Sequence, residues 1–87
     1  MTWKVVLTRN AEKELDQVGD KERRILIREL EALEKNPRSG DTKKLAGLNA
    51  YRRRKGKFRI VFTTDAERII IHKIEQRNDN TYKNPVN

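Results

Sequence analysis

One short basic segment of this sequence has the residue types that bind phosphate. Eight basic residues and no acidic residue lie between Lys43 and Arg59. They are Lys43, Lys44, Arg52, Arg53, Arg54, Lys55, Lys57 and Arg59. Guanidinium groups suit phosphate because they can bind its oxygens bidentately. The segment therefore predicts a partner rich in negative charge, either a nucleic acid or an acidic protein.

The remainder of the 87-residue chain is electrically balanced. Of 21 basic residues, the 13 outside the segment match the 13 acidic residues, so the formal net charge of +8 comes from the segment alone. A plain solvated surface is the alternative interpretation of such charge. Ordinary surfaces intersperse both signs, however, and this segment does not.

Several classes of site are excluded by composition. The chain has no cysteine, which excludes a disulfide scaffold, a thiolate zinc site and a cysteine nucleophile. No compact set of metal ligands is evident, so we expect neither a metal nor a small-molecule cofactor. The single histidine, His72, lies among isoleucines and is more typical of a packed or edge residue than of a catalytic one. No apolar stretch approaches the ~20 residues of a membrane span, and the apolar run at the N-terminus is too short for a signal peptide. We therefore expect a cytoplasmic protein with no membrane partner.

The first part of the chain has the pattern of a strand followed by two helices. Aromatic and β-branched residues indicate a strand over Trp3–Leu7. Apolar residues recur at helical spacing over Thr8–Val18 and again from Asp20 to about Lys35. Gly19 is expected to end the first helix and Asp20 to cap the second, which Asn36-Pro37 stops. The two helices would then form an antiparallel hairpin.

After a loop over Arg38–Asn49, with a possible short strand at Lys43–Leu45, the apolar period changes to two. The strands predicted there are Tyr51–Lys55, Phe58–Thr63 and Ile69–Glu75. A polar tail follows. The order of elements predicts a single α+β domain over residues 1–87, in which the helical hairpin covers one face of a three- to four-stranded antiparallel sheet.

The turn at Gly56 decides which arginines point away from the helices. If Gly56-Lys57 is a two-residue loop, Arg54 lies opposite Arg59. Alternation along the strands then places Arg52 on the same face, and the aromatic and aliphatic residues of the second strand on the other. Like charges directly opposite each other destabilise a strand pair, so this face is expected to bind an anion.

Arg53 fits this register poorly. It would share the core face with Phe58 and would have to extend past the sheet edge to reach solvent. A three-residue loop over Lys55–Lys57 would instead place Arg53 beside Arg59 and turn Arg54 inward. The sequence leaves both registers open.

These motifs, in this order, resemble the RelE/ParE toxin superfamily. The run from Tyr51 to Phe62, YRRRKGKFRIVF, resembles the family signature Tyr-Arg-x-Arg-x-Gly-x-Tyr/Phe-Arg-Ile/Val-Val-Tyr/Phe. The Lys43–Leu48 run is similar to the Lys-Leu-x-Gly approach to that strand, and Ala11–Leu15 is similar to the start of the family's first helix. The tail Arg77–Lys83 is similar to its terminal arginine–tyrosine pattern. The resemblance covers nearly the whole chain.

The resemblance implies a small α+β fold whose twisted sheet cradles RNA. RelE-like members are metal-independent endoribonucleases that cut mRNA on the ribosome, through attack of the 2′-OH on the adjacent phosphate to give a 2′,3′-cyclic phosphate. By resemblance, Arg59 would stabilise the phosphorane, with Arg77 and Tyr82 as further catalytic residues. Arg52 and Arg54 would bind substrate phosphates; arginine stays protonated in proteins, which argues against a general-base role for either. Further phosphate-binding charge would come from Lys43, Lys44, Lys55 and Lys57.

The resemblance also implies a cognate antitoxin. We expect an acidic or amphipathic antitoxin segment that covers the three arginines and packs on the helical hairpin. Two departures from the family stand out: Glu75-Gln76-Arg77 replaces the Gly-His-Arg of many relatives, and Arg53 replaces a residue that is usually apolar. Two alternatives remain open. One is a ParE-like toxin that poisons DNA gyrase without nuclease activity, and the other is a nucleic-acid-binding module without chemistry.

Overall fold

The computed structural model describes residues 3–45 and 49–76, which form two helices and five strands. In chain order these are β1 (Lys4–Leu7), α1 (Arg9–Gln17), α2 (Asp20–Lys35), β2 (Asp41–Lys44), β3 (Ala50–Lys55), β4 (Phe58–Asp65) and β5 (Arg68–Gln76). The predicted α+β order of a strand, two helices and then further strands is confirmed. Neither of these helices is long and apolar enough to cross a membrane.

The strands form one mixed sheet in the order β1-β5-β4-β3-β2. The four later strands pair antiparallel, as predicted, whereas β1 lies parallel to β5 at the sheet edge. The sequence pattern predicts no partner for the N-terminal strand, so this parallel pair is a new feature. Parallel strands need a long crossover connection, and both helices lie in the chain between β1 and β5.

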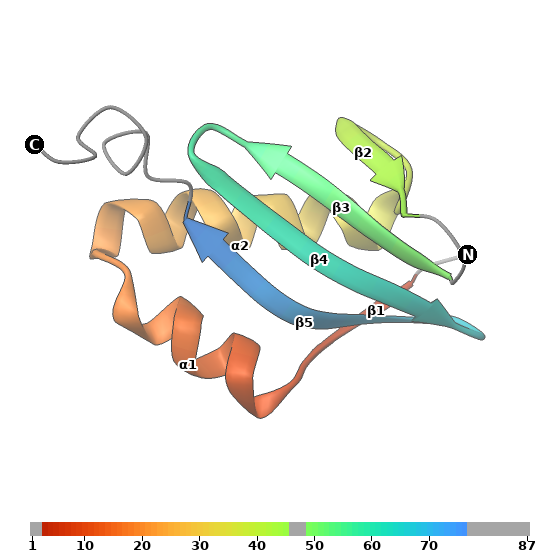
Figure 1. Ribbon diagram of the computed structural model, residues 1–87, viewed down its shortest axis with the longest axis horizontal. Helices are drawn as coiled ribbons and strands as arrows, with labels where there is room; N and C mark the ends of the chain where they lie inside the picture. Colours follow the sequence, from red (N-terminus) through yellow and green to blue (C-terminus); the bar gives the residue numbers. More distant parts are fainter. Residues whose placement is uncertain (1–2, 46–48, 77–87) are drawn as a thin grey trace, which may run out of the picture.

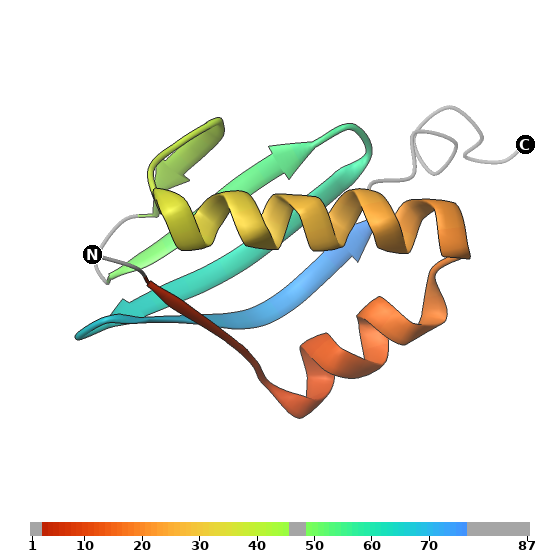
Figure 2. The same cartoon turned by 180° about the vertical axis from the view of Figure 1, so that it is seen from behind.

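Both helices cover the same face of the sheet. Figure 2 looks onto the helix-covered side and Figure 1 onto the opposite side, which the two helices leave open. The leucines predicted for the α2 stripe, Leu26, Leu30 and Leu33, are buried there, with Ala11 of α1. The sheet contributes the rest of the buried apolar core: Tyr51, Phe58, Ile60, Phe62, Ile69, Ile71 and Ile74. The core therefore lies on one side of the sheet only.

The helices meet at Val18 and Gly19 and spread apart from there in a V (Figure 2), because the apolar stripe of each faces the sheet. Gly19 has φ −67° and precedes the first residue of α2. It is therefore the N-terminal cap of α2 rather than a left-handed C-terminal cap of α1, and the prediction that Asp20 takes the cap position is wrong by one residue. Arg23 joins the helices by donating to the carbonyls of Leu15, Asp16 and Val18 at 3.2, 2.8 and 3.1 Å, which satisfies backbone acceptors left over at the end of α1.

Candidate nucleic-acid interface

The β3–β4 hairpin adopts the register of a two-residue loop. Arg54 lies opposite Arg59 and Lys55 opposite Phe58, with Gly56 at φ +58° in the turn. Phe58, Ile60 and Phe62 are buried toward the helices. Alternation therefore turns Arg52, Arg54 and Arg59 onto the open face of the sheet, and the alternative three-residue loop is excluded.

Charged residues form a row across this open face near the hairpin turn. Strand pairing aligns Asp41 with Arg54, Arg54 with Arg59, and Arg59 with Glu75. Two arginines thus lie between two carboxylates. The carboxylates come from β2 and β5, outside the acid-free segment, so sequence analysis missed them. Only the strand register could have identified them as neighbours of the arginines.

A second row crosses the face further from the turn, and it is basic. It aligns Lys43 with Arg52, Arg52 with Val61, and Val61 with Lys73. Glu75 of the first row also contacts the second row: its carboxylate is 3.8 Å from Arg59 Nη1 and 3.7 Å from Lys73 Nζ. These groups are partly exposed, so the pairs are weak and leave the cations available to a phosphate.

Two guanidinium donors on this face lack a hydrogen-bond partner. Within residues 3–45 and 49–76, Arg52 Nη1 and Arg59 Nε are shielded from solvent and donate to no acceptor. A buried donor without a partner costs about 1–3 kcal/mol. An anion that accepts hydrogen bonds from these donors would remove that cost. This agrees with the sequence-based expectation that the face with Arg54 opposite Arg59 binds an anion.

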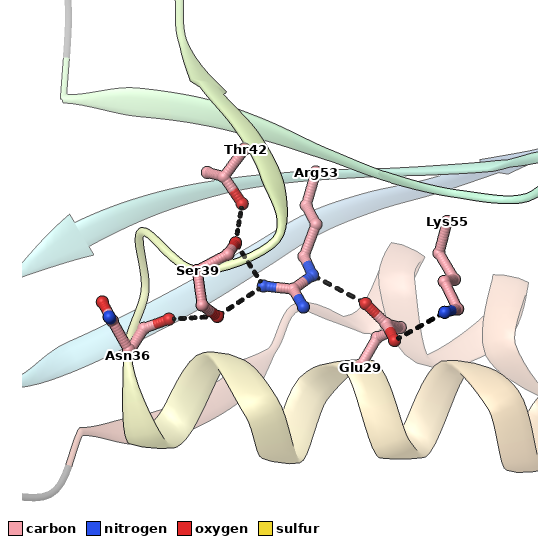
Figure 3. Close-up of polar contacts among 6 residues, drawn as sticks. All are labelled: Glu29, Asn36, Ser39, Thr42, Arg53 and Lys55. Carbon is pink, nitrogen blue, oxygen red and sulfur yellow. Dashed lines mark hydrogen bonds and ion pairs between the residues drawn. The ribbon is translucent and has the colours of Figure 1, made fainter.

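Arg53 is buried on the opposite face, under α2, with 5% of its surface exposed. Figure 3 shows its guanidinium between Glu29 and Ser39: Nε donates to Glu29 Oε1 at 2.7 Å, and Nη1 donates to the Ser39 carbonyl at 2.7 Å and to Ser39 Oγ at 3.0 Å. The expectation that Arg53 would extend past the sheet edge into solvent is wrong. Glu29 neutralises it instead, from 24 residues earlier in the chain.

Gly40 makes room for this guanidinium. A Cβ at residue 40 would lie 2.7 Å from Arg53 Nη2, and the backbone there has φ +66°, which favours glycine. The adjoining loop is held by the Thr42 hydroxyl, which donates to the Ser39 carbonyl at 2.7 Å, and by the Ser39 hydroxyl, which donates to the Asn36 carbonyl at 2.8 Å (Figure 3). Arg53 therefore ties β3 to both α2 and the approach to β2.

The predicted lysines divide between the two sides of the sheet. Lys43 lies beside Arg52 on the open face, whereas Lys44 lies beside Tyr51 and is turned the other way. Lys55 and Lys57 face α2, where their Nζ atoms lie 3.8 Å from Glu29 and 3.7 Å from Glu22. The structure thus joins only Lys43 of these four to the arginines of the open face. Arg77 and Tyr82 lie outside the described residues.

His72 is also on the open face, at an irregularity that the sequence does not predict. Val61 pairs with Lys73 and Phe62 with Ile71, so His72 is an extra residue in β5, a β-bulge. Its Nε2 lies 2.8 Å from Thr63 Oγ1.

The described residues contain no group of three or more metal-ligating side chains.

Comparison with known proteins finds similarity at the level of structure. No family model and no curated protein sequence matches the chain. Among solved structures, an archaeal RelE–RelB complex from Pyrococcus horikoshii has a chain with TM-score 0.78 and 26% identity, over 90% of this chain and 98% of that one. The toxin–antitoxin complex RelBE2 from Mycobacterium tuberculosis gives TM-score 0.77 and 18% identity, over 88% and 100%. A YoeB dimer from Staphylococcus aureus gives 0.70 and 21%, over 90% and 100%.

Proposed function

We propose that this chain, which has the fold of the RelE/ParE toxin superfamily, is the toxin of a type II toxin–antitoxin system and cleaves mRNA on the ribosome. The fold likeness to RelE and YoeB toxins supports the toxin assignment. The observation that carries the ribonuclease assignment is the open sheet face, on which strand pairing gathers Arg52, Arg54 and Arg59. Three guanidinium groups there can bind successive phosphates of one RNA strand.

The proposed reaction needs only the RNA, side chains of the protein and water for proton exchange. The ribose 2′-oxygen attacks the adjacent phosphorus and loses its proton, the bond from phosphorus to the 5′-oxygen breaks, and the leaving oxygen takes up a proton. The products are a 2′,3′-cyclic phosphate and a 5′-OH. Arg59 would stabilise the charge that builds on the phosphorane, as preorganised donors do in other phosphoryl transfers. Arg52 and Arg54 would hold the flanking phosphates. By resemblance, Arg77 would be a second phosphate clamp or would help to protonate the leaving oxygen, and Tyr82 would stack on a base and take part in proton transfer.

The proposed partner is an antitoxin with an acidic, amphipathic segment. A groove of about 320 Å³ lies between the start of α2 and the β3–β4 turn, with Ile25, Lys55 and Lys57 in its lining. Ile25 and Ile27 are 38% and 41% exposed on α2. A segment with apolar residues in this groove could continue past the β3–β4 turn and place its carboxylates beside the arginines of the open face. Two of the structurally similar proteins were solved as complexes with an antitoxin.

Mapping of mRNA 5′ ends after tightly controlled expression tests the proposal. We expect new 5′-OH ends inside translated frames for the wild type and at least a hundredfold fewer for Arg59→Ala, since one lost transition-state donor costs about 10²–10³ in rate. The matched control is Arg28→Ala, which removes the same charge from an exposed position on α2. Growth arrest with intact mRNA and DNA damage would contradict the ribonuclease and indicate gyrase poisoning. Binding without arrest or cleavage would indicate a module without chemistry.

A further inference from the structure

Histidine is the side chain that commonly exchanges protons near neutral pH, and His72 is the single histidine of this chain. The β-bulge in β5 places it on the same face of the sheet as Arg59. The neighbouring isoleucines, Ile71 and Ile74, are buried toward the helices. His72 and Lys73 together oppose Val61, so two consecutive side chains leave the core side of β5. Bulges of this kind are frequent beside active sites, where they re-aim a side chain.

The position of His72 is fixed at both its ring and its backbone. The ring nitrogen Nε2 and the Thr63 hydroxyl lie 2.8 Å apart. The His72 carbonyl accepts from Asn10 Nδ2 at 3.3 Å and from Thr8 Oγ1 at 3.4 Å. Side chains at the start of α1 thus hold the bulge where β1 has ended. A catalytic base is oriented in the same way, by a third group that fixes its tautomer.

His72 is close enough to Arg59 to act on the same nucleotide. Arg59 and Val61 are two residues apart on β4, and His72 lies beside Val61 on β5. Strand geometry puts the Cα atoms of Arg59 and His72 on the order of 8 Å apart. That distance is within the combined reach of an arginine and an imidazole to one ribose phosphate.

We propose that His72 is the general base of the RNA cleavage assigned above, an inference that rests on that proposed function. In the required tautomer, Nε2–H donates to Thr63 Oγ1 and Nδ1 accepts the proton of the attacking 2′-OH. The 2′-oxygen then bonds to phosphorus while Arg59 stabilises the phosphorane. The 5′-oxygen leaves with a proton taken from water, and the imidazolium returns its proton to solvent. The arginines of the face cannot perform this step, because arginine does not lose its proton in proteins.

The charged groups around His72 come from three strands. They are Lys73 and Glu75 on β5, Arg59 on β4 and Arg52 on β3. On its other side, β1 places the uncharged Val6 beside Ile70, and α1 contributes the uncharged Thr8 and Asn10. Glu75 is therefore the rival base on this face and has to be tested beside His72.

The test is single-turnover cleavage of a short mRNA on 70S ribosomes, measured between pH 6 and 8.5 with the full-length protein. The wild-type rate should rise with pH as the imidazole loses its proton and then level off. His72→Gln should lower the rate at least a hundredfold, since general acid–base catalysis contributes about 10²–10⁴, with RNA affinity within about threefold of wild type. Its residual rate should no longer rise with pH. Thr63→Val should give a smaller loss and keep the rise. Arg68→Gln, at the far end of β5, is the control with wild-type behaviour.

A second measurement does not depend on any variant folding. Because His72 is the single histidine, the Hε1 proton of its ring can be followed by NMR without overlap from another histidine. Its protonation midpoint in the free protein should equal the midpoint of the pH profile of kcat/KM. Two different midpoints, or a pH rise that persists in His72→Gln and disappears in Glu75→Gln, would overturn the proposal. If the wild type cleaves no RNA, the proposed function and the role of His72 both fail. If the wild type and Arg68→Gln cleave but His72→Gln is unchanged, only the role of His72 fails.

Discussion

At the scale of the residue, Arg59, the proposed phosphate ligand, already has a carboxylate beside it in Glu75. The Glu75 carboxylate lies 3.8 Å from Arg59 Nη1, and the two side chains are 40% and 36% exposed. Many members of the resembled family have glycine where this chain has Glu75. If the proposed phosphate binds here, the Glu75 carboxylate would compete with it for Arg59 and would also repel it.

Glu75→Gln should accordingly tighten RNA binding. An exposed ion pair of this kind contributes about 0.2–1 kcal/mol, so we expect a two- to fivefold lower Kd for a cleavage-resistant 2′-O-methyl RNA at low salt. The gain should shrink in high salt, where surface charges are screened. Fluorescence anisotropy at two salt concentrations measures it, with Glu31→Gln, an exposed position on α2, as the control for net charge. Equal gains from both variants would show that only net charge matters.

At the scale of the element, Arg53 determines how β3 sits in the sheet. Its bonds to Glu29 and Ser39 (Figure 3) hold it under α2, and a slip by one residue would reverse every side chain of the strand. Arg52 and Arg54 thus point to the open face because Arg53, between them, is held on the helix side. The same contact explains why the sequence alone does not decide between the two registers of the hairpin. The turn at Gly56 favours the observed register, but Arg53 looks misplaced until its distant partner Glu29 is known.

The other unpredicted features have the same origin. The helical and strand periodicities locate both helices and four of the strands, because such periodicity depends on neighbours in sequence, whereas the sequence indicates β2 (Asp41–Lys44) only as a possible short strand at Lys43–Leu45. The parallel pairing of β1 with β5, the bulge at His72 and the carboxylates beside the arginines depend on contacts between distant segments. Local patterns carry no signal for these. Hence the arginines of the candidate site could be predicted, whereas His72 could only be expected to pack.

Breaking the Arg53–Glu29 pair should destabilise the domain strongly. The two side chains are 6% and 12% exposed, and removal of one partner of a buried pair costs about 3–5 kcal/mol. Arg53→Leu and Glu29→Leu should each lower the midpoint of urea unfolding, because each leaves the other partner without its buried counter-charge. The double variant should recover much of the loss, since apolar replacement of both partners is often neutral. Additive losses in the double variant would show that the pair does not couple α2 to β3.

At the scale of the whole molecule, the apolar core and the arginine cluster lie on opposite faces of one sheet. The helices and the core occupy one face, which leaves the other face free to expose Arg52, Arg54 and Arg59 (Figures 1 and 2). Lys55 and Lys57, equally basic in the sequence, are drawn to the helix side by Glu29 and Glu22. The net charge of +8 is therefore distributed unequally, and only part of it lies on the open face, where RNA is proposed to bind.

The salt dependence of RNA binding measures that part. Each neutralised phosphate of a single strand contributes about −0.7 to the slope of log K against log salt concentration. Alanine at Arg52, Arg54 or Arg59 should each reduce the slope by about that amount, because each removes one phosphate contact. Lys55→Ala and Lys57→Ala should weaken binding slightly and leave the slope within about 0.2 of wild type, like the control Arg28→Ala. Titrations of 2′-O-methyl RNA from about 50 to 300 mM KCl give these values, since this range loses several-fold affinity per contact. If the lysine variants reduced the slope as much as the arginine variants, the RNA would pass over the hairpin turn rather than along the open face.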